Sequence, residues 1–445
     1  MKTLRLGTGA GFSGDRIEPA VDLAERGDLD YLVFECLAER TIALAQQARR
    51  LDPGAGYDPM LEPRMRAILP IQTRRRFKII SNMGAANPVA AALKTLEIAR
   101  DLGIRGLRIA AVTGDDILAA VSGTDFTVLE TGETLRAFEK PFLSANAYTG
   151  AAPIVAALEA GADVILTGRA SDPAMFLAPL IHEFGWRMDD WEKLGRGTLV
   201  GHMMECGGQV TGGYFADPGY KDVPDLANLG FPIAEVDADG NFTVTKLPGT
   251  GGRVSEATCK EQLLYEVHDP AAYLQPDVVA DFSNVLIAQE APDRVRLHGA
   301  TGHPKTGMLK VSLGFLDAYV GEGQISYAGP GAEARGQLAL EILQQRLATA
   351  QPALRESRGE LIGIDAILGA MQPDRRPARE VRLRFAARAE TAEAAGRVGN
   401  EVESLYLNGP AAGGGVTKSV REIVAIVSTL IPESLIVPGL EVLES

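Results

Sequence analysis

The sequence predicts an α/β protein, because short apolar strands alternate with amphipathic helices over its first two hundred residues. Strand patterns lie at residues 4–6, 30–34, 78–81, 107–112 and 163–167, and helical patterns separate them. Short apolar runs of this kind are typical of strands that are buried on both faces. We therefore expect a largely parallel sheet that is flanked by helices.

The pattern changes after residue 201. Residues 242–246 alternate apolar and polar side chains, which indicates a more antiparallel middle region. The tail predicts a smaller α/β portion with a strand at 381–386 and helices at 392–406 and 417–428.

The chain has 445 residues, which exceeds the usual size of a single hydrophobic core. We expect three parts: an N-terminal α/β domain at 1–200, a mixed α+β region at 201–350 and a C-terminal α/β portion at 351–445. The 44 Lys and Arg residues against 58 Asp and Glu residues give a net charge of −14. This excess of acidic groups argues against nucleic acid or an anionic membrane as a partner.

Three cysteines, Cys36, Cys206 and Cys259, lie far apart and lack CxxC spacing. Such usage predicts neither a disulfide framework nor a zinc site, and it favours the reducing cytoplasm. The N-terminus shows no signal peptide, and no apolar run approaches the ~20 residues that cross a bilayer.

Residues 201–214 combine titratable side chains with five glycines. Flexible backbone beside polar side chains is typical of small-molecule sites. If this segment begins as a helix, His202 and Glu205 share one face at i, i+3 and form an acid/base pair. Cys206 is a reserve nucleophile if nearby amides lower the pKa of its thiol, and otherwise a small buried side chain. A metal site would need further ligands, so we assign no metal.

Arg169 and Asp172 follow the strand at 163–167 and precede an expected helix. Ligands of parallel α/β sheets gather at the carboxyl ends of strands. Arg169 suits a bidentate grip on a carboxylate. Asp172 suits either proton transfer or the capping of the next helix. Glu35 and Glu39 lie four residues apart after the strand at 30–34, and we expect one of them to reach the same crevice, unless Glu39 is a solvated surface residue.

Three glycine-rich loops are each expected to precede a helix, where free N–H groups and the helix dipole hold a carboxylate or phosphate. None has the Lys-Ser/Thr ending of a nucleotide-hydrolysing loop. Lys246 ends a strand beside the second loop and is the expected cation there. The candidate binding residues are Asn82, Gly84 and Asn87 in the first loop, Gly249, Thr250, Gly251 and Gly252 in the second, and Gly413, Gly414 and Gly415 in the third.

Gly9, Gly11 and Gly14 match the dinucleotide-binding fingerprint after a strand, and Glu35 lies at about the spacing of its acidic residue. Asp15 follows Gly14 directly and would repel a pyrophosphate. A tight turn is therefore the preferred interpretation, and a nicotinamide cofactor is the alternative.

Taken together, several stretches resemble the acyclic terpene utilisation AtuA family. The resemblance rests on residues 37–41, 82–88, 160–169, 201–214, 246–252, 261–270, 276–282 and 408–410. It implies a role in the breakdown of citronellol- and geraniol-like compounds, which proceeds through branched acyl-CoA intermediates. Many relatives are paired with, or fused to, a small ferredoxin-fold domain. Because the tail shows no such domain, the resemblance implies a separate small partner subunit.

These signals predict a cytoplasmic, homo-oligomeric enzyme that acts on an organic acid or its CoA thioester. The expected chemistry is hydration or dehydration, isomerisation or C–C lysis, with proton transfer by Glu205 and Asp172 and anion binding by Arg169 and Lys246. We assign no cofactor apart from CoA as part of the substrate. Two alternatives remain: a non-catalytic subunit that binds acyl-CoA or a partner, and an NAD-dependent dehydrogenase.

Overall fold

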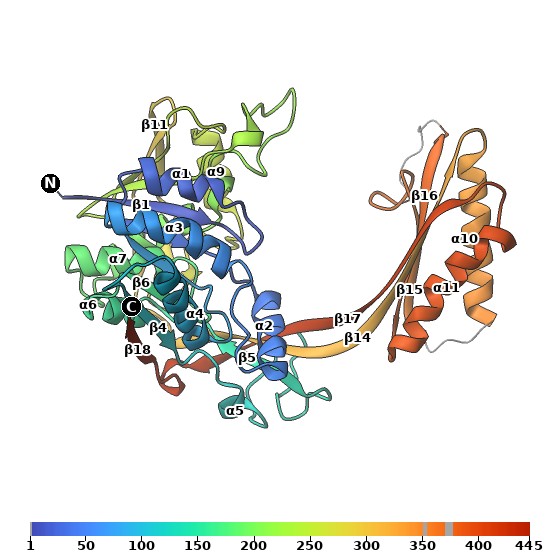
Figure 1. The fold of residues 1–445 in the computed structure, drawn as a ribbon, viewed down its shortest axis with the longest axis horizontal. Helices are drawn as coiled ribbons and strands as arrows, with labels where there is room; N and C mark the ends of the chain where they lie inside the picture. Colours follow the sequence, from blue (N-terminus) through green and yellow to red (C-terminus); the bar gives the residue numbers. More distant parts are fainter. Residues whose placement is uncertain (1, 350–353, 370–376) are drawn as a thin grey trace. The chain divides into compact units, whose positions relative to one another are not determined.

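The computed structural model describes residues 2–349, 354–369 and 377–445 (Figure 1). These residues form two compact units, Met1–Gly314 with Ile426–Ser445 and Phe315–Ala425. Both boundaries fall inside long strands, at positions other than the expected divisions near residues 200 and 350.

The first unit contains a ten-stranded sheet in the order β11-β12-β8-β7-β1-β2-β3-β6-β4-β18. Its five central strands are parallel, as the sequence predicts: β1 (Thr3–Ala10), β2 (Tyr31–Phe34), β3 (Lys78–Ser81), β6 (Val164–Thr167) and β4 (Arg108–Thr113). Antiparallel strands extend it on both sides: β7 (Pro232–Asp237), β8 (Phe242–Lys246), β12 (Arg294–His298) and β11 (Leu286–Ala291) beyond β1, and β18 (Gly439–Glu444) beyond β4. One sheet therefore joins the first two hundred residues to the antiparallel middle region.

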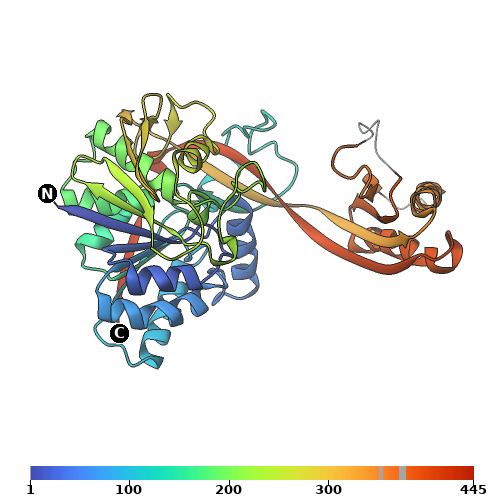
Figure 2. The same ribbon diagram turned by 90° about the horizontal axis from the view of Figure 1, so that it is seen from above.

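Helices cover both faces of this sheet, and Figure 2 shows the blue and the green helices on opposite sides of it. One layer holds α1 (Glu18–Arg26), α3 (Leu61–Arg75) and α4 (Pro88–Asp101), and the other holds α6 (Ala152–Glu159), α7 (Ala174–Phe184) and α8 (Trp191–Met204). Side chains of a strand point alternately to the two faces, so Leu32 and Phe34 enter the first core, whereas Tyr31 and Val33 enter the second.

Smaller elements complete the first unit. They are α2 (Glu39–Leu51), α5 (Leu118–Val121), β5 (Phe142–Ala147), the 3₁₀ turns at Gly207–Gln209, Leu226–Asn228 and Glu433–Leu435, α9 (Glu256–Leu264), and a three-stranded sheet of β13 (Thr301–His303), β10 (Val279–Asp281) and β9 (Tyr273–Leu274).

The chain leaves two neighbouring strands, β3 and β6, towards opposite faces of the sheet. β3 leads into α4 on the first face, and β6 leads into α7 on the second. Such a topological switch opens a crevice at the carboxyl ends of the two strands, which is where open α/β sheets bind ligands. The fold therefore directs attention to the residues that follow β3 and β6.

The second unit has the order β-α-β-β-α-β. Its elements are β14 (Met308–Ala328, which starts in the first unit), α10 (Ala332–Thr349), β15 (Leu354–Ile362), β16 (Glu380–Ala389), α11 (Ala392–Asn408) and β17 (Gly414–Pro432, which ends in the first unit). The strand order β15-β16-β14-β17 is that of a ferredoxin-like split βαβ arrangement. The expectation that the tail contains no ferredoxin-like domain is therefore wrong, because its strands pair across residues that are distant in the chain. Both helices pack on β16 and enclose one core.

One helix expected in the tail is wrong: residues 417–428 belong to the strand β17. Apolar residues at Val416, Val420 and Val424 recur every four positions and imitate a helical face. The segment is nevertheless rich in β-branched side chains, which lose rotamer freedom in a helix and fit a strand. Within the described residues, no helix is both long and apolar enough to cross a membrane.

Candidate functional site

Four polar residues lie along the carboxyl edge of the parallel strands. Glu35 follows β2, Asn82 follows β3, Arg169 lies just after β6, and Asp115 lies just after β4. Because β2, β3, β6 and β4 are neighbours in this order, the four residues line one edge of the sheet. The topological switch between β3 and β6 lies in the middle of this row.

Glu35 is held in place by its neighbours on this edge. Its Oε1 accepts hydrogen bonds from the Leu37 amide at 2.8 Å and from Asn82 Nδ2 at 2.9 Å. Asn82 is fully buried, and its Oδ1 accepts from the Cys36 amide at 2.7 Å. Burial raises the pKa of Glu35, and the positive charge of Arg169 opposes part of that rise. Asn82, a predicted ligand-binding residue, therefore positions a carboxyl group.

His202 and Glu205 pair as their i, i+3 spacing predicts, in the last turn of α8. His202 Nδ1 lies 3.1 Å from Glu205 Oε1, and Nε2 lies 3.1 Å from the carbonyl oxygen of Leu263. A carbonyl oxygen can only accept, so Nε2 carries a hydrogen. The remaining contact, between Nδ1 and Oε1, therefore shares one mobile proton: either histidinium faces carboxylate, or neutral imidazole faces a carboxylic acid.

The second oxygen of Glu205, Oε2, is buried and has no hydrogen-bond partner. Burial raises the pKa of Glu205, the hydrogen bond with His202 opposes that rise, and the Glu35 carboxylate adds to it. This electrostatic coupling joins the end of α8 to the sheet edge. Thr8 Oγ1 fixes the same turn to β1 by donating to the Met204 carbonyl at 2.8 Å.

Cys206 follows Glu205 and is partly buried. Burial and the Glu205 carboxylate raise the pKa of its thiol well above the ordinary value. The thiolate is therefore scarce near neutral pH, and the environment does not supply the lowered pKa that a nucleophile would need.

Arg169 and Asp172 contact each other directly. Arg169 is 1% exposed, and its guanidinium donates to the Leu37 and Ala170 carbonyls and to the Asp172 carboxylate. Most of its donors thus tie the loops after β2 and β6 together. Asp172 keeps 34% of its side-chain exposure and does not cap α7, whose N-cap is Pro173.

A more exposed group adjoins this arginine. The Arg169 guanidinium lies 4.4 Å from the centre of the Tyr148 ring, and Tyr148 Oη donates to Glu39 at 2.5 Å. Lys310 Nζ donates to the same Glu39 oxygen at 3.1 Å. Burial opposes ionisation of Glu39, but these two hydrogen bonds and the lysine charge lower its pKa to about 2. Glu39 and Lys310 keep 39% and 44% of their exposure, so this side of the cluster faces solvent.

The first glycine loop uses its amides internally. The Ala85, Ala86 and Asn87 amides donate to carbonyl oxygens of residues 82, 56 and 84. A Cβ on Gly84 would lie 2.4 Å from the Thr167 carbonyl oxygen, so this glycine allows β3 and β6 to come close at the switch. Asn87 caps α4 by accepting from the Ala90 amide.

The second loop follows β8, and its polar groups bond within the protein. In the second, Lys246 Nζ is largely buried, donates to the Thr250 carbonyl at 2.8 Å and lies 3.4 Å from Asp293. Gly251 and Gly252 pack against backbone of residues 225 and 211. The third loop, residues 413–415, belongs to the second unit, and it leads into β17 rather than into the helix we expected.

The glycines of the dinucleotide pattern pack against protein. A Cβ on Gly9 would meet the Phe34 ring at 2.4 Å, and one on Gly11 would meet the Cys206 carbonyl carbon at 2.5 Å. The Gly11 amide donates to Asp15 Oδ2 at 2.9 Å, where a pyrophosphate oxygen would otherwise be bound. This geometry favours the tight turn over the nicotinamide alternative.

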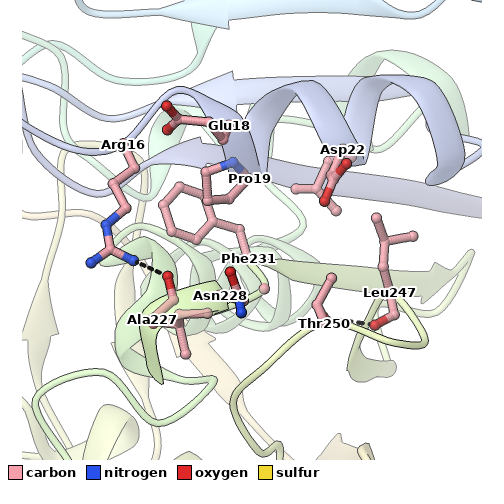
Figure 3. Close-up of a pocket in the computed structure, with 12 residues that line it drawn as sticks. Arg16, Glu18, Pro19, Asp22, Ala227, Asn228, Phe231, Leu247 and Thr250 are labelled. Carbon is pink, nitrogen blue, oxygen red and sulfur yellow. Dashed lines mark hydrogen bonds between the residues drawn. The ribbon is translucent and has the colours of Figure 1, made fainter. Parts of the chain in front are cut away.

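A cavity of about 420 Å³ lies under α1, apart from the acid/base cluster (Figure 3). Its floor includes Leu23, Phe231 and Leu247, which belong to the core of the α1 face. Of the predicted site residues only Thr250 lines it.

Several residues of the cluster were not assigned a role from the sequence. Asp115 follows a predicted strand, so the carboxyl-edge argument could have found it. Tyr148 and Lys310 carry no local signal. In the described part of the chain, no group of three or more His, Cys, Asp or Glu side chains has the arrangement of a metal site.

Comparison with known proteins gives one family match. The model described as acyclic terpene utilisation family protein AtuA matches residues 4–442. Neither the curated proteins nor the solved structures contain a match to this chain.

Proposed function

The chain belongs to the acyclic terpene utilisation AtuA family, and from this membership and the buried carboxyl cluster we propose that it is a cytoplasmic enzyme of organic-acid or branched acyl-CoA catabolism. Its reaction is acid/base chemistry next to a carboxylate or thioester carbonyl, in the class of hydro-lyases, isomerases and C–C lyases. CoA enters as part of the substrate, and the enzyme is a homo-oligomer. Because the second unit of this chain itself has the ferredoxin-like strand order, no separate ferredoxin-fold subunit is proposed.

One observation carries the proposal: the unpartnered, buried Glu205 Oε2 beside His202. A buried acceptor without a partner is costly unless a ligand completes it, and groups with perturbed pKa values cluster at functional sites. The pair holds a mobile proton, so Glu205 can give up or take a proton while the neighbouring His202 balances the change in its charge. A carboxyl group with a raised pKa suits general acid/base catalysis near neutral pH.

Glu35 is the proposed partner of Glu205 in proton transfer, because burial also raises its pKa and the two carboxyl groups influence each other. Arg169 and Asn82 act as positioning residues, since their hydrogen bonds hold the loops that carry Glu35. Asp172, an expected base, acts through Arg169 in this scheme. Substrate enters from the side of Asp172 and Glu39, which is the exposed side of the cluster.

Exchange of substrate hydrogen with D₂O tests the proposal. The wild-type chain is incubated with a panel of branched acyl-CoA thioesters and free acids, and mass spectrometry follows deuterium at the carbon beside the carbonyl. Glu205→Gln should slow this exchange by about 100-fold or more, because general acid/base catalysis contributes a factor of that order. The melting temperature should change little, because the amide can still pair with His202.

Glu261→Gln is the matched control, because Glu261 is an exposed glutamate on α9 that pairs with Lys221. It should exchange at the wild-type rate. Full exchange by Glu205→Gln, or no exchange by the wild type with any member of the panel, would overturn the proposal.

A further inference from the structure

Asp115, just after β4, is the fixed end of a chain of buried hydrogen bonds. Its Oδ2 accepts from Asn146 Nδ2 at 2.8 Å and from the Arg169 backbone amide at 2.9 Å. A Cβ on Gly168 would overlap Asp115 Oδ1, so the loop after β6 lies directly against this carboxyl group. Asp115 is 5% exposed, and Asn146 and Arg169 are 1% exposed. The position of the loop therefore depends on a buried side chain of another strand end.

The chain of hydrogen bonds continues from Arg169 to Glu35. The Arg169 guanidinium donates to the Leu37 carbonyl oxygen, and the Leu37 amide donates to Glu35 Oε1 at 2.8 Å. Leu37 thus connects the cation and the carboxyl group through its own backbone. Burial raises the pKa of Glu35 and the Arg169 charge opposes that rise, so the distance between the two groups matters for proton transfer.

Helix α2 closes this chain into a ring. It begins at Glu39, two residues after Leu37, and its Gln46 donates from Nε2 to Asn146 Oδ1 at 3.3 Å. The same nitrogen donates to Asp116 Oδ2 at 3.0 Å. The ring therefore passes through α2, β5 and the loops that follow β2, β4 and β6. Because a buried polar group that loses its partner is costly, these bonds favour one arrangement of the three loops.

We propose that Asp115 is a positioning residue of the acid/base site: through Arg169 it holds the loop that carries Glu35 and keeps the guanidinium two hydrogen bonds away from that carboxyl group. The role of Glu35 in proton transfer rests on the proposed function, whereas the ring of hydrogen bonds does not. Burial raises the pKa of Asp115 to about 6, so its carboxylate is ionised at neutral pH and accepts both bonds with its charge. Glu39 and Glu205 also act on Glu35, and both are left unchanged in the test.

Titration of Glu35 tests this inference without any substrate. The chain is labelled with ¹³C at the glutamate carboxyl carbons, and NMR follows the Glu35 signal from pH 4 to pH 9; its absence from Glu35→Gln identifies it. In Asp115→Ala the Arg169 amide loses its acceptor and the guanidinium is no longer held, so the Glu35 midpoint should move to higher pH. Removal of the Asp115 charge alone would move the midpoint to lower pH, so the direction separates the two effects. An unchanged or lower midpoint would overturn the inference.

Three further variants keep the titration decisive if Asp115→Ala does not fold. Asn146→Leu leaves every charge in place and removes the donor on β5, so it should shift the Glu35 midpoint in the same direction. Asp115→Asn retains an acceptor oxygen and should give a lower midpoint than Asp115→Ala. Asp277→Ala removes an equally buried carboxyl group, which pairs with the Ala151 amide, and is the control. It should leave the midpoint unchanged, and an equal shift there would indicate a merely structural effect and contradict the assignment.

Exchange with D₂O then shows whether the proposed reaction depends on the ring. At neutral pH Asp115→Ala should slow deuterium incorporation by about tenfold or more, because a misplacement of about 1 Å can cost a factor of about 100. The rate should recover in part at higher pH, where Glu35 is again ionised, and an equal loss at every pH would contradict the inference. If the wild type exchanges no member of the panel, the proposed function fails, and the titration still decides whether Asp115 positions Glu35.

Discussion

At the residue scale, two buried carboxyl groups make the stability of the first unit depend on pH. Asp277 is buried, and both of its oxygens lie 3.0 Å from the Ala151 amide at the start of α6. Burial raises the pKa of Asp277 to about 6, although the Ala151 hydrogen bond opposes the rise. Asp115, on the sheet edge, shows the same shift to about 6 for the same reason. Both groups are more easily protonated in the folded chain than in the unfolded one.

Asp277→Asn should therefore flatten the acid side of the stability curve. An acid whose pKa is raised by folding stabilises the fold below its unfolded pKa, near 4, and this contribution is lost as pH rises to about 6. A shift of two units corresponds to about 3 kcal/mol. Urea unfolding at pH 4, 5, 6 and 7 should show the wild type losing about that much more stability than the variant. Parallel curves for the two proteins would contradict the assignment.

Residue-level expectations succeeded where they depended on spacing within one element. The His202–Glu205 pair follows from helical periodicity alone, and the carboxyl-edge location of Arg169 follows from its position after a strand. The bond from Arg169 to the Leu37 carbonyl and the bond from the Ala86 amide to the Gly56 carbonyl could not be assigned, because these two partners lie far away in the chain. Glycine marks a close approach in the sequence, but only the fold tells whether a ligand or another backbone comes close.

At the scale of elements, Arg64 of α3 joins the three loops that follow β1, β2 and β3. Its fully buried guanidinium donates to the carbonyl oxygens of Phe12, Ser13 and Asp15 after β1, and to the Cys36 sulfur after β2. A longer contact of 3.8 Å reaches the Met83 sulfur after β3. One buried side chain thus contacts both loops that carry Glu35 and Asn82.

Arg64→Lys should destabilise the chain by about 3 kcal/mol, because a lysine keeps the charge but cannot reproduce the planar fork of donors. Arg66→Lys, two residues along the same helix, is the matched control: its ion pairs with Glu62 and Asp101 are exposed, so about 0.5 kcal/mol or less is expected. Chemical denaturation measures both. Equal, small effects would show that the loops hold their positions without Arg64.

Strands were predicted reliably where both faces are buried, and the error in the tail shows why. In β2 and β6 every residue is buried, and such an uninterrupted run fits a strand better than a helix with one exposed face. In β17 the exposed half, Thr417–Glu422, mixes charged and apolar residues. Its valines repeat at four-residue intervals, and only pairing with a neighbouring strand decides between the two patterns.

At the scale of the whole molecule, the second unit has a hydrophobic core of its own, and continuous strands explain why its boundaries were not visible in the sequence. The core of the second unit is formed by α10, α11 and the strands between them, with Ile325, Leu361 and Leu383 fully or almost fully buried. The chain enters and leaves this unit inside β14 and β17, which continue as strands across both boundaries. Linker composition, the usual sign of a domain boundary, is absent from continuous strands.

Separate cores predict separate responses to core mutations. Leu383→Ala removes a fully buried side chain of β16 and should destabilise the second unit by about 2–5 kcal/mol. Hydrogen exchange followed by mass spectrometry should then show faster exchange in residues 315–425 only, because local opening follows cooperative units. Ile165→Ala in β6, equally buried, is the reciprocal control and should accelerate exchange in the first unit only. If either mutation accelerated exchange uniformly through both units, the chain would unfold as one cooperative body, and the two units would be parts of a single folding unit.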